Sequence, residues 1–308
     1  MTPSRVLVTG SNGFVGRHLL PILANRFPGA TLQSAQFDVT DRAAVFSTIR
    51  QSPPDICLHL AAISAVPAAR QDPDRAWQVN LHGTLHLADA LRAEAPDCLL
   101  VFASSADAYG MSFRSGMALT EGAPLAPLNI YGATKAAADL ALGAMAAEGL
   151  RVVRVRAFNH IGPGQSEDFV VAAFARQLAR IALGRQPLVM QVGDLSPMRD
   201  FMDVRDVCAG YAACIEVAER LAPGEALNLA SGVPRRVADV LEDLMQAAGV
   251  HPEIQTDPTR LRPSDIPVVC GSAAKARDLL GWRPMIPWTE TIASVTRYWK
   301  DRVASEPT

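Results

Sequence analysis

RVLVTGSNGFVG, residues 5–16, joins a short β-rich run to a stretch with helical spacing. Three glycines separate the two parts, at Gly10, Gly13 and Gly16. Glycines at this spacing permit a tight turn, close approach of the backbone to a pyrophosphate and close packing of the helix on the strand. The triplet alone is weak evidence, but between a strand and a helix it favours a dinucleotide-binding loop. The residues expected to line this loop are Gly10, Asn12, Gly13, Phe14, Val15 and Gly16.

Short β-rich runs alternate with helical spacing throughout the first half of the chain. The expected strands are 5–9, 55–62, 98–105 and 151–158, and the expected helices are 15–25, 76–94 and 131–148. Such alternation is typical of repeated βαβ units. It predicts an α/β fold with a Rossmann-type, doubly wound parallel sheet.

The pattern changes after Phe158, where loops rich in Gly and Pro surround a further apolar helix. We predict a dinucleotide-binding domain over 1–158, with a return to it at about 200–230. Residues 159–308 are expected to form mainly a smaller α/β substrate-binding domain.

Composition limits the partners of the chain. Its 308 residues are 49% apolar and 19% charged, with a net charge of -2, which favours neither nucleic acid nor an anionic membrane surface. No apolar run has the roughly 18 residues of a membrane helix, and the first strand begins too early for a signal peptide. We therefore expect a cytoplasmic enzyme acting on a small molecule.

Metal and disulfide sites are not expected. The five cysteines are scattered through apolar surroundings and form no Cys-x-x-Cys pair, so buried thiols are expected. His82, His86 and Asp89 share a helix face, but no Glu follows His82 and a third ligand is missing. A solvated face or a subunit interface is the better interpretation.

Tyr131 and Lys135 are four residues apart, which places both on one face of a helix. An ammonium at about 4 Å supplies on the order of 4 kcal/mol, enough to lower the pKa of a phenol by about three units. Tyr-x-x-x-Lys is common by chance. Here it follows a strand expected to end near a substrate, which favours a catalytic pair.

The G-x-x-G-x-x-G spacing, within TG-x-x-GF-x-G, resembles the extended branch of the short-chain dehydrogenase/reductase superfamily. The segment 104–110, SSADAYG, is similar to the family's Ser-Ser-x-x-x-Tyr-Gly. The resemblance implies that Ser105 is the hydroxyl that orients a substrate carbonyl, with Tyr131 as proton donor and Lys135 beside it. In related sugar 4,6-dehydratases an acid at the position of Asp107 removes a proton, whereas reductases need no such base. Local hydrogen bonding by Asp107 is an equally good interpretation.

The same resemblance suggests further contacts with the cofactor. They are Asp38 and Val39 for adenine, the strand end at Leu60, Ala61 and Ala62, Asn80 at the start of a helix, and His160 near the nicotinamide. Asp38 could instead belong to a helix cap. The segment 31–38 offers neither an acid for NAD nor an arginine for NADP at the usual place, so the choice between the two cofactors stays open.

Several segments of the second half resemble bacterial GDP-4-keto-6-deoxymannose reductases. These are 156–166, 192–195, 199–206 and 261–265. Arg199 and Arg262 could grip a diphosphate, Asp265 could accept from a ribose, and Asn159 could donate to phosphate. Asp107 and Ser105 complete the expected substrate contacts.

The resemblance implies an NAD(P)H-dependent reductase of a GDP-6-deoxy-4-keto sugar, with a product of the GDP-rhamnose type. A nucleotide-sugar 4,6-dehydratase or 4-epimerase with tightly bound NAD would use the same three residues. A catalytically silent dinucleotide-binding sensor would need no proton relay. The family also implies a homodimer formed through the helix after Asn80 and the helix that carries Tyr131.

Overall fold

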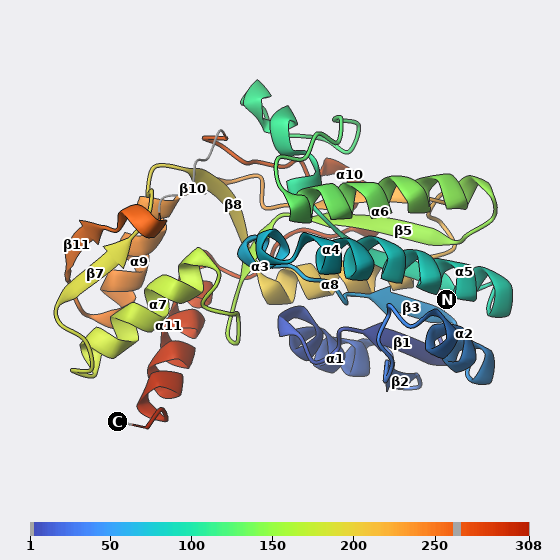
Figure 1. Ribbon diagram of the computed structural model, residues 1–308, viewed down its shortest axis with the longest axis horizontal. Coiled ribbons are helices and arrows are strands. Elements are labelled where there is room, and N and C mark those ends of the chain that lie inside the picture. Colours follow the sequence, from blue (N-terminus) through green and yellow to red (C-terminus); the bar gives the residue numbers. More distant parts are fainter. Residues whose placement is uncertain (1–2, 261–265, 308) are drawn as a thin grey trace.

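The computed structural model describes residues 3–260 and 266–307, and a large parallel sheet lies at its centre (Figure 1). Its six strands have the order β2-β1-β3-β4-β5-β9, and every neighbouring pair is parallel. The strands are β1 (Arg5–Thr9), β2 (Thr31–Ser34), β3 (Ile56–His59), β4 (Leu99–Ser105), β5 (Val152–Ala157) and β9 (Glu225–Leu229). The predicted Rossmann-type sheet is confirmed.

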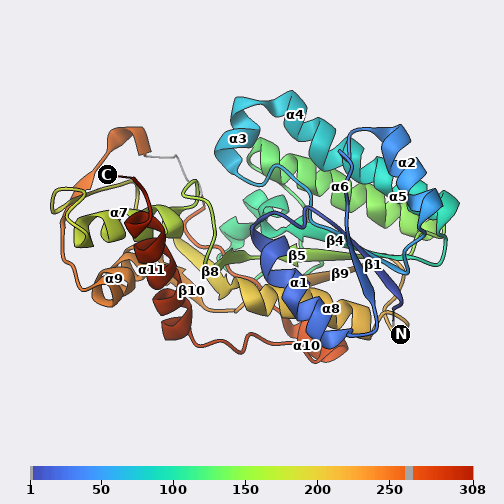
Figure 2. The same cartoon turned by 90° about the horizontal axis from the view of Figure 1, so that it is seen from below.

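Helices cover both faces of this sheet, as the doubly wound prediction requires. Figure 2 shows α1, α8 and α10 on one side and α2, α5 and α6 on the other. These helices are α1 (Phe14–Arg26), α2 (Arg42–Gln51), α5 (Thr84–Glu94), α6 (Ile130–Ala147), α8 (Val204–Glu216) and α10 (Ala274–Leu280). Along β1, Val6 and Val8 join the core beneath α1 and α8, whereas Leu7 joins the core beneath α2 and α5. Alternate side chains therefore bury both faces of each strand.

The predicted helix over 76–94 is three consecutive pieces. It comprises α4 (Pro73–Trp77), the π-helical turn η1 (Gln78–Gly83) and α5. Asn80, expected to begin a helix, lies inside the π-helical turn instead. The short elements beside it are α3 (Val66–Gln71) and, after β4, the 3₁₀ turns η2 (Ala106–Ala108) and η3 (Gly110–Ser115).

The remaining elements pack together at the left of Figure 1. Two small sheets have the orders β10-β8-β6 and β11-β7. Their strands are β6 (Asn159–Ile161), β7 (Val189–Val192), β8 (Met198–Asp203), β10 (Pro234–Arg236) and β11 (Glu253–Thr256). They are accompanied by α7 (Val170–Ala182), α9 (Val237–Ala248), η4 (Pro258–Arg260) and α11 (Trp288–Ala304). We call α7, β7, α9, β11, η4 and α11 the distal region.

The chain returns to the large sheet between these elements, because α8 packs on α1 and β9 pairs with β5. β1 has β2 on one side and β3 on the other, so the connections leaving it reverse direction there. Ligands of open α/β sheets bind beyond the carboxyl ends of the strands at such a point.

Candidate active site

The turn between β1 and α1 has the shape of a pyrophosphate cradle. Gly10 has φ +67°, and a Cβ there would lie 2.7 Å from the amide nitrogen of Ala61. A Cβ at Gly16 would lie 2.4 Å from a carbonyl oxygen of the same turn, so only glycine allows α1 to begin this close. Asn12 and Gly13 are exposed at the start of α1, whose unpaired amides favour an anion. These residues fit a dinucleotide.

Other residues expected to contact the cofactor surround this turn. Phe14 and Val15 are half-buried in the first turn of α1, and the Phe14 ring stacks on His160 with centroids 6.1 Å apart and planes within 5°. Leu60 to Ala62 are half-buried directly after β3. The structure thus brings these expected cofactor residues to one edge of the sheet.

Asp38 has partners within the protein. Its carboxylate accepts hydrogen bonds from the Thr40 amide at 2.9 Å and hydroxyl at 2.8 Å, and it pairs with Arg75 at 2.9 Å. The hydrogen bonds from Thr40 and Arg75 lower the pKa of Asp38 to about 2. Asp41, rather than Asp38, caps α2. Val39 is buried beside it, and contact of either residue with adenine stays a prediction.

Ser105, Asp107 and Tyr131 meet where β4 ends and α6 begins. The Ser105 hydroxyl accepts a hydrogen bond from the Asp107 amide at 3.1 Å, and its side chain is hydrogen-bonded to the Tyr131 phenol. Gly132 makes this approach possible, because a Cβ there would lie 2.6 Å from the carbonyl oxygen of Asp107. The Asn129 side chain caps α6 by accepting from the Gly132 amide at 2.7 Å.

The pKa of Tyr131 shifts in the opposite direction to the one predicted from the sequence. Burial, followed by the charge of Asp107, raises it above the ordinary value for a phenol, against the hydrogen bond with Ser105, which lowers it. Helical spacing alone could not show that desolvation outweighs the charge of a neighbouring ammonium. Tyr131 is therefore protonated at neutral pH and ready to donate its proton.

Lys135 is buried beneath this group. Its ammonium donates to the carbonyl oxygen of Ala103 at 2.7 Å and lies 4.9 Å from the centroid of the Phe102 ring. Burial lowers the pKa of Lys135 to about 8, and the charge of Asp139 opposes that shift. Lys135 therefore changes charge close to physiological pH.

We expect turnover to fall as pH rises through about 8. The pKa of Lys135 lies near 8, so the side chain is cationic below that pH and neutral above it, where it no longer stabilises the phenolate left after proton donation. The measurement is kcat at saturating substrates from about pH 6 to about pH 10. A guanidinium keeps its charge over this range, so residual turnover of Lys135→Arg should not fall. A flat profile for the unaltered protein would contradict the assignment.

A buried ionic cluster lies beside Lys135 and was not predicted from the sequence. Asp139 accepts from Ser104 at 2.6 Å, from Arg154 at 2.8 Å and from Arg156 at 3.0 and 2.8 Å. Asp139 and Arg156 are 0% and 4% exposed, so this pairing is shielded from water. Ser104 thus has a structural partner, as expected.

Asn80 is fully buried and all of its side-chain polar groups have partners in the protein. Its oxygen accepts from the Ile63 amide at 2.8 Å, and its nitrogen donates to the Ile63 carbonyl at 3.0 Å and to the Thr134 hydroxyl at 2.9 Å. These bonds join the loop after β3 to the helix of Tyr131. A direct contact with the cofactor stays a prediction.

The expected substrate residues come from two parts of the structure. Asn159 is exposed at the start of β6, and Arg199 is half-buried on β8, where it donates to the Met198 and Ile266 carbonyls at 2.8 and 3.2 Å. Burial raises the pKa of Asp107, and the charge of Arg199 opposes the shift, so Arg199 faces the catalytic end of β4. The predictions for Arg262 and Asp265 lie outside the described residues.

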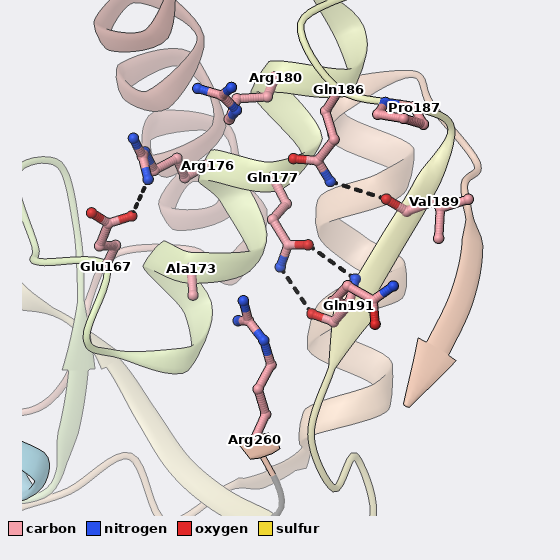
Figure 3. Close-up of a pocket in the computed structure, with 10 residues that line it drawn as sticks. All are labelled: Glu167, Ala173, Arg176, Gln177, Arg180, Gln186, Pro187, Val189, Gln191 and Arg260. Carbon is pink, nitrogen blue, oxygen red and sulfur yellow. Dashed lines mark hydrogen bonds and ion pairs between the residues drawn. The ribbon is translucent and has the colours of Figure 1, made fainter. Parts of the chain in front are cut away.

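A pocket of about 700 Å³ lies in the distal region (Figure 3). It is lined by Glu167, Ala173, Arg176, Gln177, Arg180, Gln186, Pro187, Val189, Gln191 and Arg260. The Arg260 side chain extends towards Ala173 and Gln177 in Figure 3. Gln177 is fixed by two bonds of 3.0 Å with the backbone of Gln191. The sequence analysis missed this pocket, because its residues come from separate elements.

The sequence expectations on cysteines and metal ligands can be compared with side-chain positions. All five cysteines are buried and free. His86 is hydrogen-bonded to the Val39 carbonyl at 3.2 Å, and Asp89 pairs with Arg42 at 4.0 Å. Over 3–260 and 266–307, no group of three or more His, Cys, Asp or Glu side chains is placed to hold a metal. Across those same residues, no helix is long and apolar enough to cross a membrane.

Comparison with known proteins finds similarity over nearly the whole chain. A family model described as GDP-mannose 4,6 dehydratase matches residues 26–295. The GDP-6-deoxy-D-mannose reductase of Pseudomonas aeruginosa is 37% identical over 305 residues, which cover 98% of this chain and 99% of that protein.

Two solved structures share the fold and differ in their bound cofactor. RMD from Pseudomonas aeruginosa complexed with NADPH has a TM-score of 0.89 and 34% identity, covering 97% of this chain and 99% of the other. The UDP-glucose 4-epimerase of Thermus thermophilus in complex with NAD has a TM-score of 0.84 and 29% identity, covering 96% and 99%. Similar proteins therefore bind NADPH or NAD in this fold.

Proposed function

The chain belongs to the GDP-mannose 4,6-dehydratase family of extended short-chain dehydrogenases/reductases, and from that premise we propose that it reduces the C4 ketone of a GDP-6-deoxy-4-keto sugar. Members of this family are NAD(P)-dependent enzymes that modify nucleotide sugars. The observation that carries the proposal is the protonated Tyr131 phenol, hydrogen-bonded to Ser105 at the carboxyl end of β4. A site that must give a proton to a ketone oxygen needs its acid protonated at rest.

Each residue of this group has a distinct task in the proposed reaction. NADPH or NADH, when bound in the cradle of Gly10, Asn12 and Gly13, supplies the hydride. Ser105 holds the ketone oxygen by a hydrogen bond, and Tyr131 gives it a proton as negative charge develops. Lys135 stabilises the resulting phenolate through its positive charge.

The arginine and glutamine groups of the distal pocket suit the nucleotide base of the substrate. Guanine presents two adjacent acceptors that an arginine fork binds well. Arg260 extends into the pocket beside Ala173, and Glu167 accepts from Arg176 at its rim. We place the guanine here.

Filling this pocket should raise KM without lowering kcat. Ala173→Leu inserts a branched side chain among the lining residues, so KM for the GDP-sugar should rise about tenfold while kcat is kept. Ala182→Leu is the control, because Ala182 is exposed on the same helix outside the lining. Equal KM values for the two variants would place the base elsewhere.

The direct test follows the absorbance of the reduced cofactor with freshly prepared GDP-4-keto-6-deoxymannose. We expect one equivalent of NADPH or NADH to be oxidised for each ketone reduced. Conversion of a nucleotide sugar with no net consumption of cofactor would identify a 4,6-dehydratase or a 4-epimerase instead. Bound dinucleotide without turnover of any nucleotide sugar would favour the binding module.

A homodimer formed through α5 and α6 is also proposed. Leu140 of α6 is 59% exposed, an unusual position for a large apolar side chain on a helix that otherwise packs against the sheet. Light scattering should give twice the mass of the chain, and Leu140→Glu should halve it at micromolar concentration. A monomer mass for the unaltered protein at every concentration would refute the proposal.

A further inference from the structure

Buried polar side chains form a continuous path from the cofactor cradle to the catalytic helix. The path consists of Thr9, His59, Thr84, Asn80 and Thr134, each no more than 1% exposed. Thr9 ends β1 next to Gly10, and Thr134 lies one turn beyond Tyr131. None of the residues between these two ends has a task in the proposed reaction.

The hydrogen bonds of Thr84 fix the tautomer of His59. The Thr84 hydroxyl donates its single proton to the Asn80 carbonyl at 2.7 Å. Its oxygen lies 2.9 Å from His59 Nε2, so that nitrogen must be the donor. His59 therefore carries its proton on Nε2, and its Nδ1 is an acceptor.

The bonds on either side follow from this tautomer. His59 Nδ1 accepts from the Thr9 hydroxyl at 2.7 Å, and the Thr9 oxygen accepts from the Ala61 amide at 3.2 Å. At the other end, Asn80 Nδ2 donates to the Thr134 hydroxyl at 2.9 Å, and that hydroxyl donates to the Tyr131 carbonyl at 2.8 Å. Every donor and acceptor along the path is used in one consistent direction.

The π-helical turn η1 is the local feature that allows this path. It places the carbonyl of Asn80 opposite the Thr84 hydroxyl while the side chain of Asn80 reaches α6. Turns of this kind are uncommon and occur often at functional sites.

The surroundings of His59 keep its ring neutral. Burial, and then the charge of Lys135, lowers the pKa of His59 to about 3. The Phe102 ring lies beside both groups, 5.9 Å from the His59 centroid and 4.9 Å from the Lys135 ammonium. A protonated imidazole would have no acceptor at Nδ1, because the Thr9 hydroxyl would then have to receive protons from both His59 and Ala61.

We propose that His59, fixed as its Nε2-H tautomer, is a positioning residue that couples the cofactor cradle to the first turn of the catalytic helix. It acts through Thr84, Asn80 and Thr134 on the backbone of Tyr131, and through Thr9 on the loop at Ala61. The kinetic consequence rests on the proposed reduction by Tyr131, whereas the tautomer does not.

The kinetic test compares Thr84→Val with Thr84→Ser. Valine keeps the volume but removes both bonds of the hydroxyl, so kcat should fall about tenfold while KM for the sugar stays within about twofold. Serine keeps the hydroxyl and should retain kcat within about twofold. Thr291→Val is the matched control, since Thr291 is 1% exposed and donates to Asp203 at 2.9 Å, away from this path.

A purely structural role predicts that Thr84→Val and Thr291→Val lose stability alike and keep their turnover. That result would overturn the proposal. A loss of kcat in Thr84→Val alone, restored by serine, supports it.

Nuclear magnetic resonance tests the path without any substrate. The ¹⁵N shifts of His59 should report a protonated Nε2 and an unprotonated Nδ1 from about pH 5 to about pH 8. The carbonyl ¹³C shift of Tyr131 should change in Thr84→Val and stay unchanged in Thr84→Ser. Titration of His59 in this range, a proton on Nδ1, or an unaltered Tyr131 carbonyl in Thr84→Val would overturn the proposal, even if the reductase assay fails.

Discussion

Tyr131→Phe should lower kcat for ketone reduction by about 10³-fold while dinucleotide binding is kept. A positioned general acid contributes about 10² to 10⁴ in rate, and the phenol is the group that burial and Asp107 keep protonated beside Ser105. Phenylalanine keeps the ring and loses only the hydroxyl. The measurements are kcat by loss of reduced cofactor and dinucleotide affinity by protein fluorescence.

The Tyr131→Phe result is interpretable because a second tyrosine offers a matched comparison. Tyr109 is fully buried, and its hydroxyl donates to Asn228 at 2.7 Å and accepts from Arg156 at 3.0 Å, away from Ser105. Tyr109→Phe should lower stability more than turnover. Undiminished kcat in Tyr131→Phe would defeat the assignment of the proton donor.

Asp139→Asn should lower the free energy of unfolding by about 3 to 5 kcal/mol. Removing one partner of a buried ion pair leaves an uncompensated charge, and here Arg154 and Arg156 both lose their carboxylate. Equilibrium denaturation with urea measures the change. Because Asp139 also opposes the lowering of the Lys135 pKa, the alkaline fall in kcat should begin at a lower pH.

An exposed ion pair provides the control for Asp139→Asn. Asp38 pairs with Arg75 at 2.9 Å, with the two side chains 52% and 42% exposed. Such pairs contribute about 0 to 1 kcal/mol, so Asp38→Asn should have a small effect. Equal losses for the two variants would show that the buried cluster does not stabilise the fold.

The sheet and the catalytic group could be predicted because both depend on local patterns. Apolar runs of period two gave the strands within a few residues, and the helix expected at 237–248 has those bounds in α9. Ser105 and Tyr131 meet because a parallel strand and the next helix must approach one another at one edge of the sheet. The glycine spacing at 10, 13 and 16 predicted a turn that only glycine can form.

Contacts between distant segments could not be predicted in the same way. Arg154 and Arg156 lie two residues apart on β5 and reach Asp139 on α6, a pairing that no local spacing encodes. Two arginines on one face of a buried strand were nevertheless a visible signal of a buried acid. The direction of the Tyr131 shift also escaped prediction, since desolvation depends on the whole neighbourhood of the phenol.

The π-helical turn Gln78–Gly83 has a consequence for how this stretch can change in evolution or by design. Removing one of its residues would let α4 and α5 merge into a regular α-helix, but everything beyond would rotate by about 100° about the axis. Thr84, Leu87 and Leu91 would then turn away from the interior together. A one-residue gap in an aligned sequence at this place would mark a rewired interior, even in a homologue that keeps every residue of the catalytic group.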